Sequence, residues 1–95
     1  MNFEWDAGKR QRNLEKHGID FLDVQKVFSH PILIQHDGRQ DYREERWIGI
    51  GLMEWLVLVV VFTEPNEETI RIISVRKAKK HEKKSYENWI QNRLG

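Results

Sequence analysis

Seven consecutive apolar residues, Leu56 to Phe62, constrain the fold more than any other feature of the chain. The run has the length of a β-strand and is far shorter than the roughly 18 apolar residues of a membrane-spanning helix. Because none of its positions is polar, both faces of the strand must be covered, as in the centre of a sheet. We therefore predict a central strand over residues 55–63 and no membrane segment.

Patterns on either side of this run predict helices and further strands. A helix is expected over residues 7–17, with Asp6 as its N-cap and Gly18 as the residue that ends it. Only Leu14 offers this helix an obvious apolar contact. A second helix should begin after Asp20 and end at Pro31. It carries a core stripe at helical spacing, made of Phe21, Val24, Val27 and Phe28.

The remaining elements complete an α+β domain. Strands are expected over residues 32–34, 46–51 and 69–76, with a short one over 3–5, a turn at Pro65-Asn66 and a last helix over 78–94. Short connections between successive strands favour antiparallel pairing. We predict one domain over residues 1–95, with a small antiparallel sheet of three to five strands, two N-terminal helices and one C-terminal helix. Without cysteine or a visible secretory signal, it is expected to be cytoplasmic.

Charge is unevenly distributed along the chain, although the net charge is only +1. One basic cluster lies between Arg76 and Lys84, and a second comprises Lys9, Arg10, Arg12 and Lys16. Each cluster alone is typical of a solvated face. If both fold onto one side, they form a footprint for a polyanion.

Three blocks of the sequence together resemble the BrnT family. The first runs from Phe3-Glu4-Trp5-Asp6 through Lys16-His17-Gly18-Ile19 and Phe21 to Val27-Phe28, the second comprises residues 45–51 and 59–63, and the third is 71–78 with Glu82 and Tyr86. The resemblance implies a compact RelE-like fold and a ribonuclease toxin of a type II toxin–antitoxin module that arrests translation. It also implies a cognate BrnA-like antitoxin with a DNA-binding domain, through which alone the toxin would reach operator DNA. The chain departs from the family at Pro65, where relatives usually carry an arginine, and the departure predicts a weakened activity.

Metal-independent RNA cleavage needs a base for the 2′-hydroxyl, cations for the phosphate and an acid for the leaving oxygen. Candidate catalytic residues are Arg71, Arg76, Arg46 and Glu45. Glu45 and Glu82 could instead pair with these arginines as structural salt bridges. Further candidates for proton transfer are His17, His36, His81 and Tyr86. Arg71 and Arg76 have opposite parity in a regular strand, so only a bulge or the helix start brings them to one face.

Candidate RNA-binding residues come from both basic clusters and one aromatic: Lys9, Arg12, Lys16, Trp47, Lys77, Lys80 and His81. Trp47 either stacks on an unpaired base or belongs to the core. His81 either takes part in the site or is a surface residue of a lysine-rich helix. No histidine or carboxylate spacing matches a metal-ligand pattern, so we expect neither metal nor cofactor.

The sequence thus favours a metal-independent endoribonuclease that acts as a toxin on RNA. A non-catalytic module that binds RNA or antitoxin, with a decayed active site, is the alternative. A role in protein assembly, with an acidic antitoxin tail over the basic helices, is compatible with the first interpretation.

Overall fold

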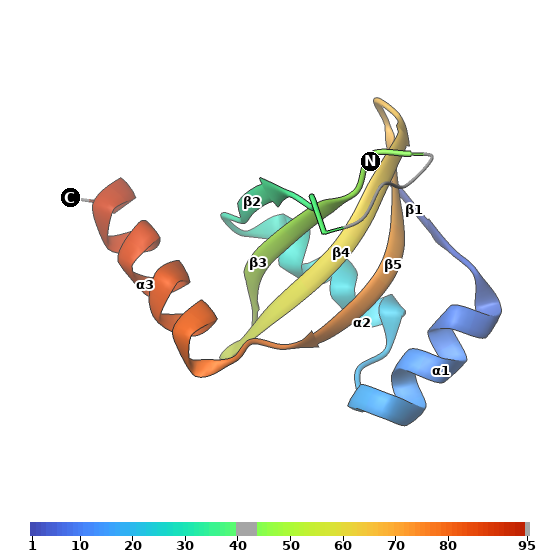
Figure 1. The fold of residues 1–95 in the computed structure, drawn as a ribbon, viewed down its shortest axis with the longest axis horizontal. Coiled ribbons are helices and arrows are strands. Elements are labelled where there is room, and N and C mark those ends of the chain that lie inside the picture. The colour runs from blue at the N-terminus through green and yellow to red at the C-terminus, as the bar shows by residue number, and fades with distance from the viewer. Residues whose placement is uncertain (40–43, 95) are drawn as a thin grey trace.

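The computed structural model describes residues 1–39 and 44–94 and shows a five-stranded sheet with helices on both faces (Figure 1). The elements are β1 (Asn2–Trp5), α1 (Ala7–His17), α2 (Phe21–Val24), the 3₁₀-helix η1 (Gln25–Ser29), β2 (Leu33–His36), β3 (Trp47–Met53), β4 (Leu56–Asn66), β5 (Thr69–Lys77) and α3 (Lys80–Leu94). The α+β class is confirmed. No helix in the described part of the chain is long and apolar enough to span a membrane.

The sheet is mixed, which corrects the prediction of a wholly antiparallel one. Its strand order is β1-β5-β4-β3-β2, and β1 runs parallel to β5 from the pair Asn2↔Thr69 to the pair Trp5↔Ile72. The other neighbours pair antiparallel. Turn signals predict pairing only between strands that follow each other in the sequence. They could not predict the β1–β5 pairing, because it joins the first and the last strand of the chain.

The apolar run does form the central strand, β4, and it is covered on both faces. Leu58, Val60 and Phe62 belong to the main core, together with residues of α2, η1 and β5. Val57 and Val59 face the other way, into a smaller cluster with Tyr86 of α3. The predicted second helix is shorter than expected, since α2 is followed by the 3₁₀-helix η1.

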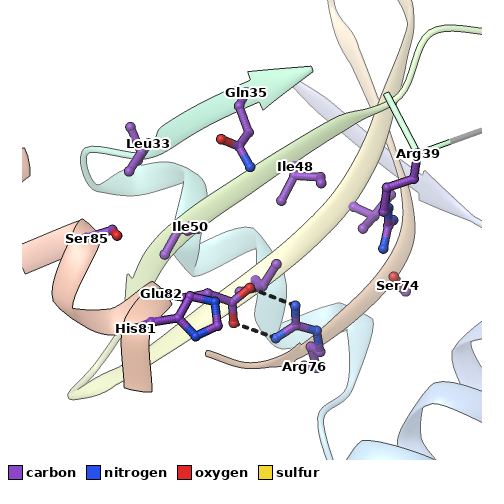
Figure 2. A pocket seen from close by; sticks show the side chains of 12 residues that line it. Leu33, Gln35, Arg39, Ile48, Ile50, Ser74, Arg76, His81, Glu82 and Ser85 are labelled. Carbon is purple, nitrogen blue, oxygen red and sulfur yellow. Dashed lines mark hydrogen bonds and ion pairs between the residues drawn. The ribbon is translucent and has the colours of Figure 1, made fainter. Parts of the chain in front are cut away.

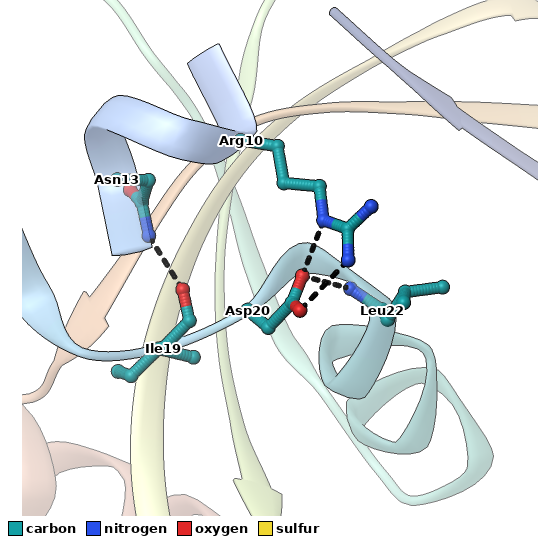
Figure 3. Close-up of polar contacts among 5 residues, drawn as sticks. All are labelled: Arg10, Asn13, Ile19, Asp20 and Leu22. Atoms are coloured by element: carbon teal, nitrogen blue, oxygen red, sulfur yellow. Dashed lines mark hydrogen bonds and ion pairs between the residues drawn. The ribbon is translucent and has the colours of Figure 1, made fainter. Parts of the chain in front are cut away.

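Helix α1 is attached through a buried amide and an ion pair rather than through Leu14, whose side chain is exposed. Asn13 is buried and donates from Nδ2 to the Ile19 carbonyl (3.1 Å), while its Oδ1 accepts from the Val75 N–H (3.0 Å). Arg10 donates to both Asp20 oxygens at 2.7 and 2.9 Å, and Asp20 also accepts from the Leu22 N–H at the start of α2 (Figure 3). These contacts fix α1 beside β5.

A bulge in β5 brings Arg71 and Arg76 to one face of the sheet. Val61 pairs with Ser74 and Phe62 with Ile72, so Ile73 is an extra residue in β5. An extra residue reverses the alternation of side chains beyond it. As a result, Arg71 opposite Thr63 and Arg76 opposite Val59 share a face, as the parity argument required.

Several boundaries differ from the predicted ones by a few residues, and two of them bear on the candidate site. β4 continues through Pro65 to Asn66, and the turn lies at Glu67-Glu68, where the Asn66 side chain accepts from the Glu68 N–H. β3 begins at Trp47, so Arg46 lies just before the strand instead of inside it.

Candidate functional site

Two rows of side chains cross the open face of the sheet and form the floor of a hollow of about 400 Å³ (Figure 2). Paired registers give the rows as Leu33, Ile50, Val59 and Arg76, and as Gln35, Ile48, Val61 and Ser74. Arg39 borders the hollow from the segment after β2, and His81, Glu82 and Ser85 border it from α3. The floor is apolar in the middle, with an arginine at its β5 edge.

Arg76 is held at this edge by Glu82. Its Nη1 and Nη2 donate to the two Glu82 oxygens, each at 2.8 Å, and Nη1 also donates to the Lys77 carbonyl. Glu82 accepts a further bond from the Lys79 N–H at 2.7 Å, which caps the start of α3. Hydrogen bonding with Arg76 lowers the pKa of Glu82 to about 2. The carboxylate therefore stays ionised and fixes both the guanidinium and the helix.

Arg39 is a second cation at the hollow, and sequence reasoning missed it. Its Nε and Nη2 donate to the two oxygens of Asp37, each at 2.8 Å, and the Asp37 side chain is fully buried. Hydrogen bonding with Arg39 lowers the pKa of Asp37. The like charge of Arg39 also opposes the rise that Glu82 causes in the pKa of Arg76. The Asp37-Gly38-Arg39 sequence in a polar loop was the available signal.

The remaining candidates for proton transfer differ in whether they reach the hollow. His81 borders the hollow from the first turn of α3. Tyr86 is buried under α3, where its hydroxyl donates to the Pro31 carbonyl at 2.9 Å and burial raises its pKa. His36 lies edge-on to Trp47, with ring centroids 5.3 Å apart. His81 is thus the imidazole, among the described residues, that reaches the hollow.

The basic face of α1 adjoins the hollow through Ser74. A shallow depression is lined by Lys9, Arg12, Asn13, Lys16, His17, Ile73 and Ser74, and Ser74 also borders the main hollow. The three predicted RNA-binding residues of α1 therefore lie together and next to the hollow. Lys77 and Lys80 are exposed at the junction of β5 and α3, outside both depressions.

The other predicted catalytic residues lie outside the hollow. Arg71 donates to Glu4 at 2.7 Å and lies 3.7 Å from a Glu44 oxygen. Arg46 is half-buried, and its carbonyl accepts from the Asp37 N–H. Glu45 lines a separate depression, with Glu44, Trp47, Thr63, Glu64 and Pro65. Trp47 also packs against the main core, which is the second of the two roles considered for it in the sequence.

No cluster of three or more histidine, cysteine or acidic side chains suited to a metal ion occurs in residues 1–39 and 44–94. What the site does offer is fixed cations around an apolar floor, beside a basic helix. This arrangement defines a small α+β domain suited to binding a polyanion through its phosphates.

The chain belongs to the BrnT family. Residues 5–82 match the sequence model of that family, which is described as the ribonuclease toxin, BrnT, of type II toxin-antitoxin systems. The structure of this chain is similar to the crystal structure of the Brucella abortus ribonuclease toxin BrnT. The TM-score is 0.63 and the sequence identity is 29%, over 84% of this chain and 99% of that one. A comparison with curated proteins gives no significant match. The resemblance noted in the sequence is thereby confirmed.

Proposed function

We propose that this protein is a metal-independent endoribonuclease, the toxin of its module, and that its active site is the hollow on the open face of the sheet. The observation that carries the proposal is the convergence of Arg76, Arg39 and His81 on that hollow, beside the basic face of α1. Cations aimed at a reacting phosphate supply a large share of catalysis in such sites.

In the proposed reaction, the 2′-oxygen of a ribose attacks the adjacent phosphorus and the bond from phosphorus to the 5′-oxygen breaks. The 2′-hydroxyl loses a proton, the leaving 5′-oxygen gains one, and the products carry a 2′,3′-cyclic phosphate and a 5′-hydroxyl. Arg76 and Arg39 neutralise the charge that gathers on the phosphate. Arg76 keeps its Nε–H and one Nη2–H for this, because its described hydrogen bonds use the others.

Removal of the 2′-hydroxyl proton is assigned to His81, because its imidazole borders the hollow and has a ring nitrogen that can accept a proton, while the leaving 5′-oxygen takes its proton from solvent water. Glu82 has a pKa of about 2 and is therefore a poor proton acceptor at neutral pH. Its part is to position Arg76.

The experiment is to incubate purified protein with RNA in EDTA and to map the ends of the products. Arg76→Ala should lower the cleavage rate by about 10²- to 10³-fold, as the loss of one fixed donor does elsewhere. Arg71→Ala is the matched control, since Arg71 lies in the same strand and on the same face but outside the hollow. Loss of wild-type cleavage in EDTA would contradict the metal-free mechanism. A larger effect of Arg71→Ala than of Arg76→Ala would move the active site to the other end of β5.

A cognate antitoxin of the BrnA type is proposed as the partner, because a toxin of a type II system implies an antitoxin. The antitoxin would carry the DNA-binding domain, and the proposed place of action is the cytoplasm. Co-expressed antitoxin should purify with the toxin and abolish cleavage. In a gel-shift assay, operator DNA should bind the complex and not the toxin alone.

A second candidate is a module that binds RNA or antitoxin without cleavage. Pro65, which replaces the family's usual arginine, lies in a depression shared with Glu44, Glu45 and Glu64. Carboxylates there repel phosphate, which weakens RNA contacts at that end of the sheet. Salt-sensitive RNA binding without any product, and no growth arrest on expression, would favour this candidate.

A further inference from the structure

We propose that the β2 side of the hollow is a nucleobase subsite and that Gln35 reads the hydrogen-bonding edge of the base. The inference rests on the proposed function, because it places the base beside the phosphate that Arg76 holds. It adds a residue that determines which RNA sequences are cut.

The geometry comes from the rows that cross the sheet. Gln35 stands on the edge strand β2, three strand spacings from Ser74, or about 14 Å between backbones. Gln35 and Ser74 stand at the two ends of this span (Figure 2). The space between them is floored by Ile48 and Val61. This apolar floor lies between Arg76 at the β5 edge and the Gln35 carboxamide at the β2 edge.

The chemistry of the floor suits the face of a base. Ile48 and Val61 present an apolar surface beside the charged β5 edge. In the proposed complex the phosphate lies at that edge, and the base of the same nucleotide lies flat on the apolar surface. Unpaired RNA bases are recognised by contact with their faces and by hydrogen bonds to their edges. Gln35 can supply the hydrogen bonds to the edge of the base, because it is exposed and its carboxamide makes no hydrogen bond with residues 1–39 or 44–94. Its side chain points over the hollow (Figure 2).

A carboxamide offers donors and an acceptor side by side, so it pairs with a base edge that has one of each. Adenine is the base that glutamine pairs with in this bidentate way in nucleic-acid complexes, and we expect it in the subsite. A carboxylate at position 35 would only accept hydrogen bonds. Gln35→Glu should therefore favour guanine, whose edge carries two adjacent donors.

The test measures base preference in two assays on folded protein. In the first, wild type, Gln35→Leu and Gln35→Glu cleave a random pool of short RNAs, and the bases flanking each cut are sequenced. In the second, the same proteins bind oligonucleotides that carry a 2′-deoxyribose at the cleavage position and differ in one base. Gln91→Leu, in an exposed position of α3 away from the hollow, is the matched control.

Wild type and Gln91→Leu should prefer adenine at one position next to the cut by about 5- to 100-fold. Gln35→Leu should flatten this preference and Gln35→Glu should shift it to guanine, in both assays. If wild type cleaves and the Gln35 variants keep its preference, the subsite is refuted while the ribonuclease stands. If wild type binds but does not cleave, the proposed function fails, and the binding assay alone decides on Gln35. Equal binding of all bases by every variant would refute the subsite.

Discussion

Replacing Asn13 with alanine removes the hydrogen bond that joins α1 to β5 and a second one that joins α1 to the segment before α2. The Val75 N–H faces the edge of β5 beyond the last pair with β1, Trp5↔Ile72, so no strand partners it there. The Asn13 carboxamide takes the place of that partner and also donates to the Ile19 carbonyl. Alanine leaves a buried donor and a buried acceptor without partners.

The cost follows from the two groups left unpaired. Each buried group that loses its partner costs about 1–3 kcal/mol, so the two groups together should lower the free energy of unfolding of Asn13→Ala by about 2–6 kcal/mol. For a domain of this size, each kcal/mol shifts Tm by about 4–8 °C, and a loss of about 3 kcal/mol should lower Tm by roughly 12–24 °C. Asn13→Asp keeps the acceptor but sets a carboxylate against the Ile19 carbonyl, so it should be destabilising as well.

Thermal and urea unfolding followed by circular dichroism measure the loss. Asn92→Ala, in an exposed position of α3, is the control and should stay within about 0.5 kcal/mol of wild type. Hydrogen exchange adds a local readout, because the Val75 amide should lose protection in Asn13→Ala before its neighbours in β4 do. The reasoning is refuted if Asn13→Ala unfolds like wild type, or if the Val75 amide stays protected.

Two further predictions concern the ion pair at the hollow and the packing under it. Because the folded-state pKa of Glu82 is depressed to about 2, its stabilisation is complete above about pH 4.5 and is lost as pH falls towards 2. Wild type should thus exceed Glu82→Gln by about 2 kcal/mol at neutral pH and lose that advantage in acid, as followed by urea unfolding at a series of pH values. A difference that does not change with pH would contradict this. Gly51→Ala should cost about 1–3 kcal/mol, since the new Cβ would lie 2.5 Å from Cγ1 of the buried Val27. At Gly8 in α1 a new Cβ would lie 3.1 Å from Arg12 Nη1 and 3.1 Å from Oδ1 of the N-cap Asp6. The gain in helix propensity is then offset by crowding of the cap, so Gly8→Ala should stay within about 0.5 kcal/mol of wild type, and thermal unfolding compares it with Gly51→Ala.

Local signals predicted the elements well and their contacts less well. Asp6 and Gly18 mark the ends of α1 as expected, because caps act within one turn of the helix. The attachment of α1 could not be predicted, since Asn13 is a polar residue in a polar helix and its partner lies 62 positions away. Hydrophobic patterning pointed to Leu14 instead.

The candidate site shows the same division. Arg76 and His81 could be selected by residue type and position, and both border the hollow. Arg71 could not be separated from Arg76 in the sequence, because its pairing with Glu4 depends on β1 lying beside β5. Arg39 was missed since its place at the hollow depends on a buried Asp37, and burial of a loop carboxylate has no local signature. The bulge at Ile73, which puts both arginines on one face, also leaves no clear mark in a β-branched run.

The parallel pairing of β1 with β5 has a consequence for the order in which the molecule is made. Glu4 and Arg71 are 67 positions apart, and synthesis proceeds from the N-terminus, so β1 has no strand to pair with until β5 has been translated. The hollow is completed later still, because its α3 wall, with His81, Glu82 and Ser85, follows β5 in the chain. An unfinished chain therefore has no assembled site, and a ribosome that makes this protein is not exposed to its proposed activity until translation has passed Ser85.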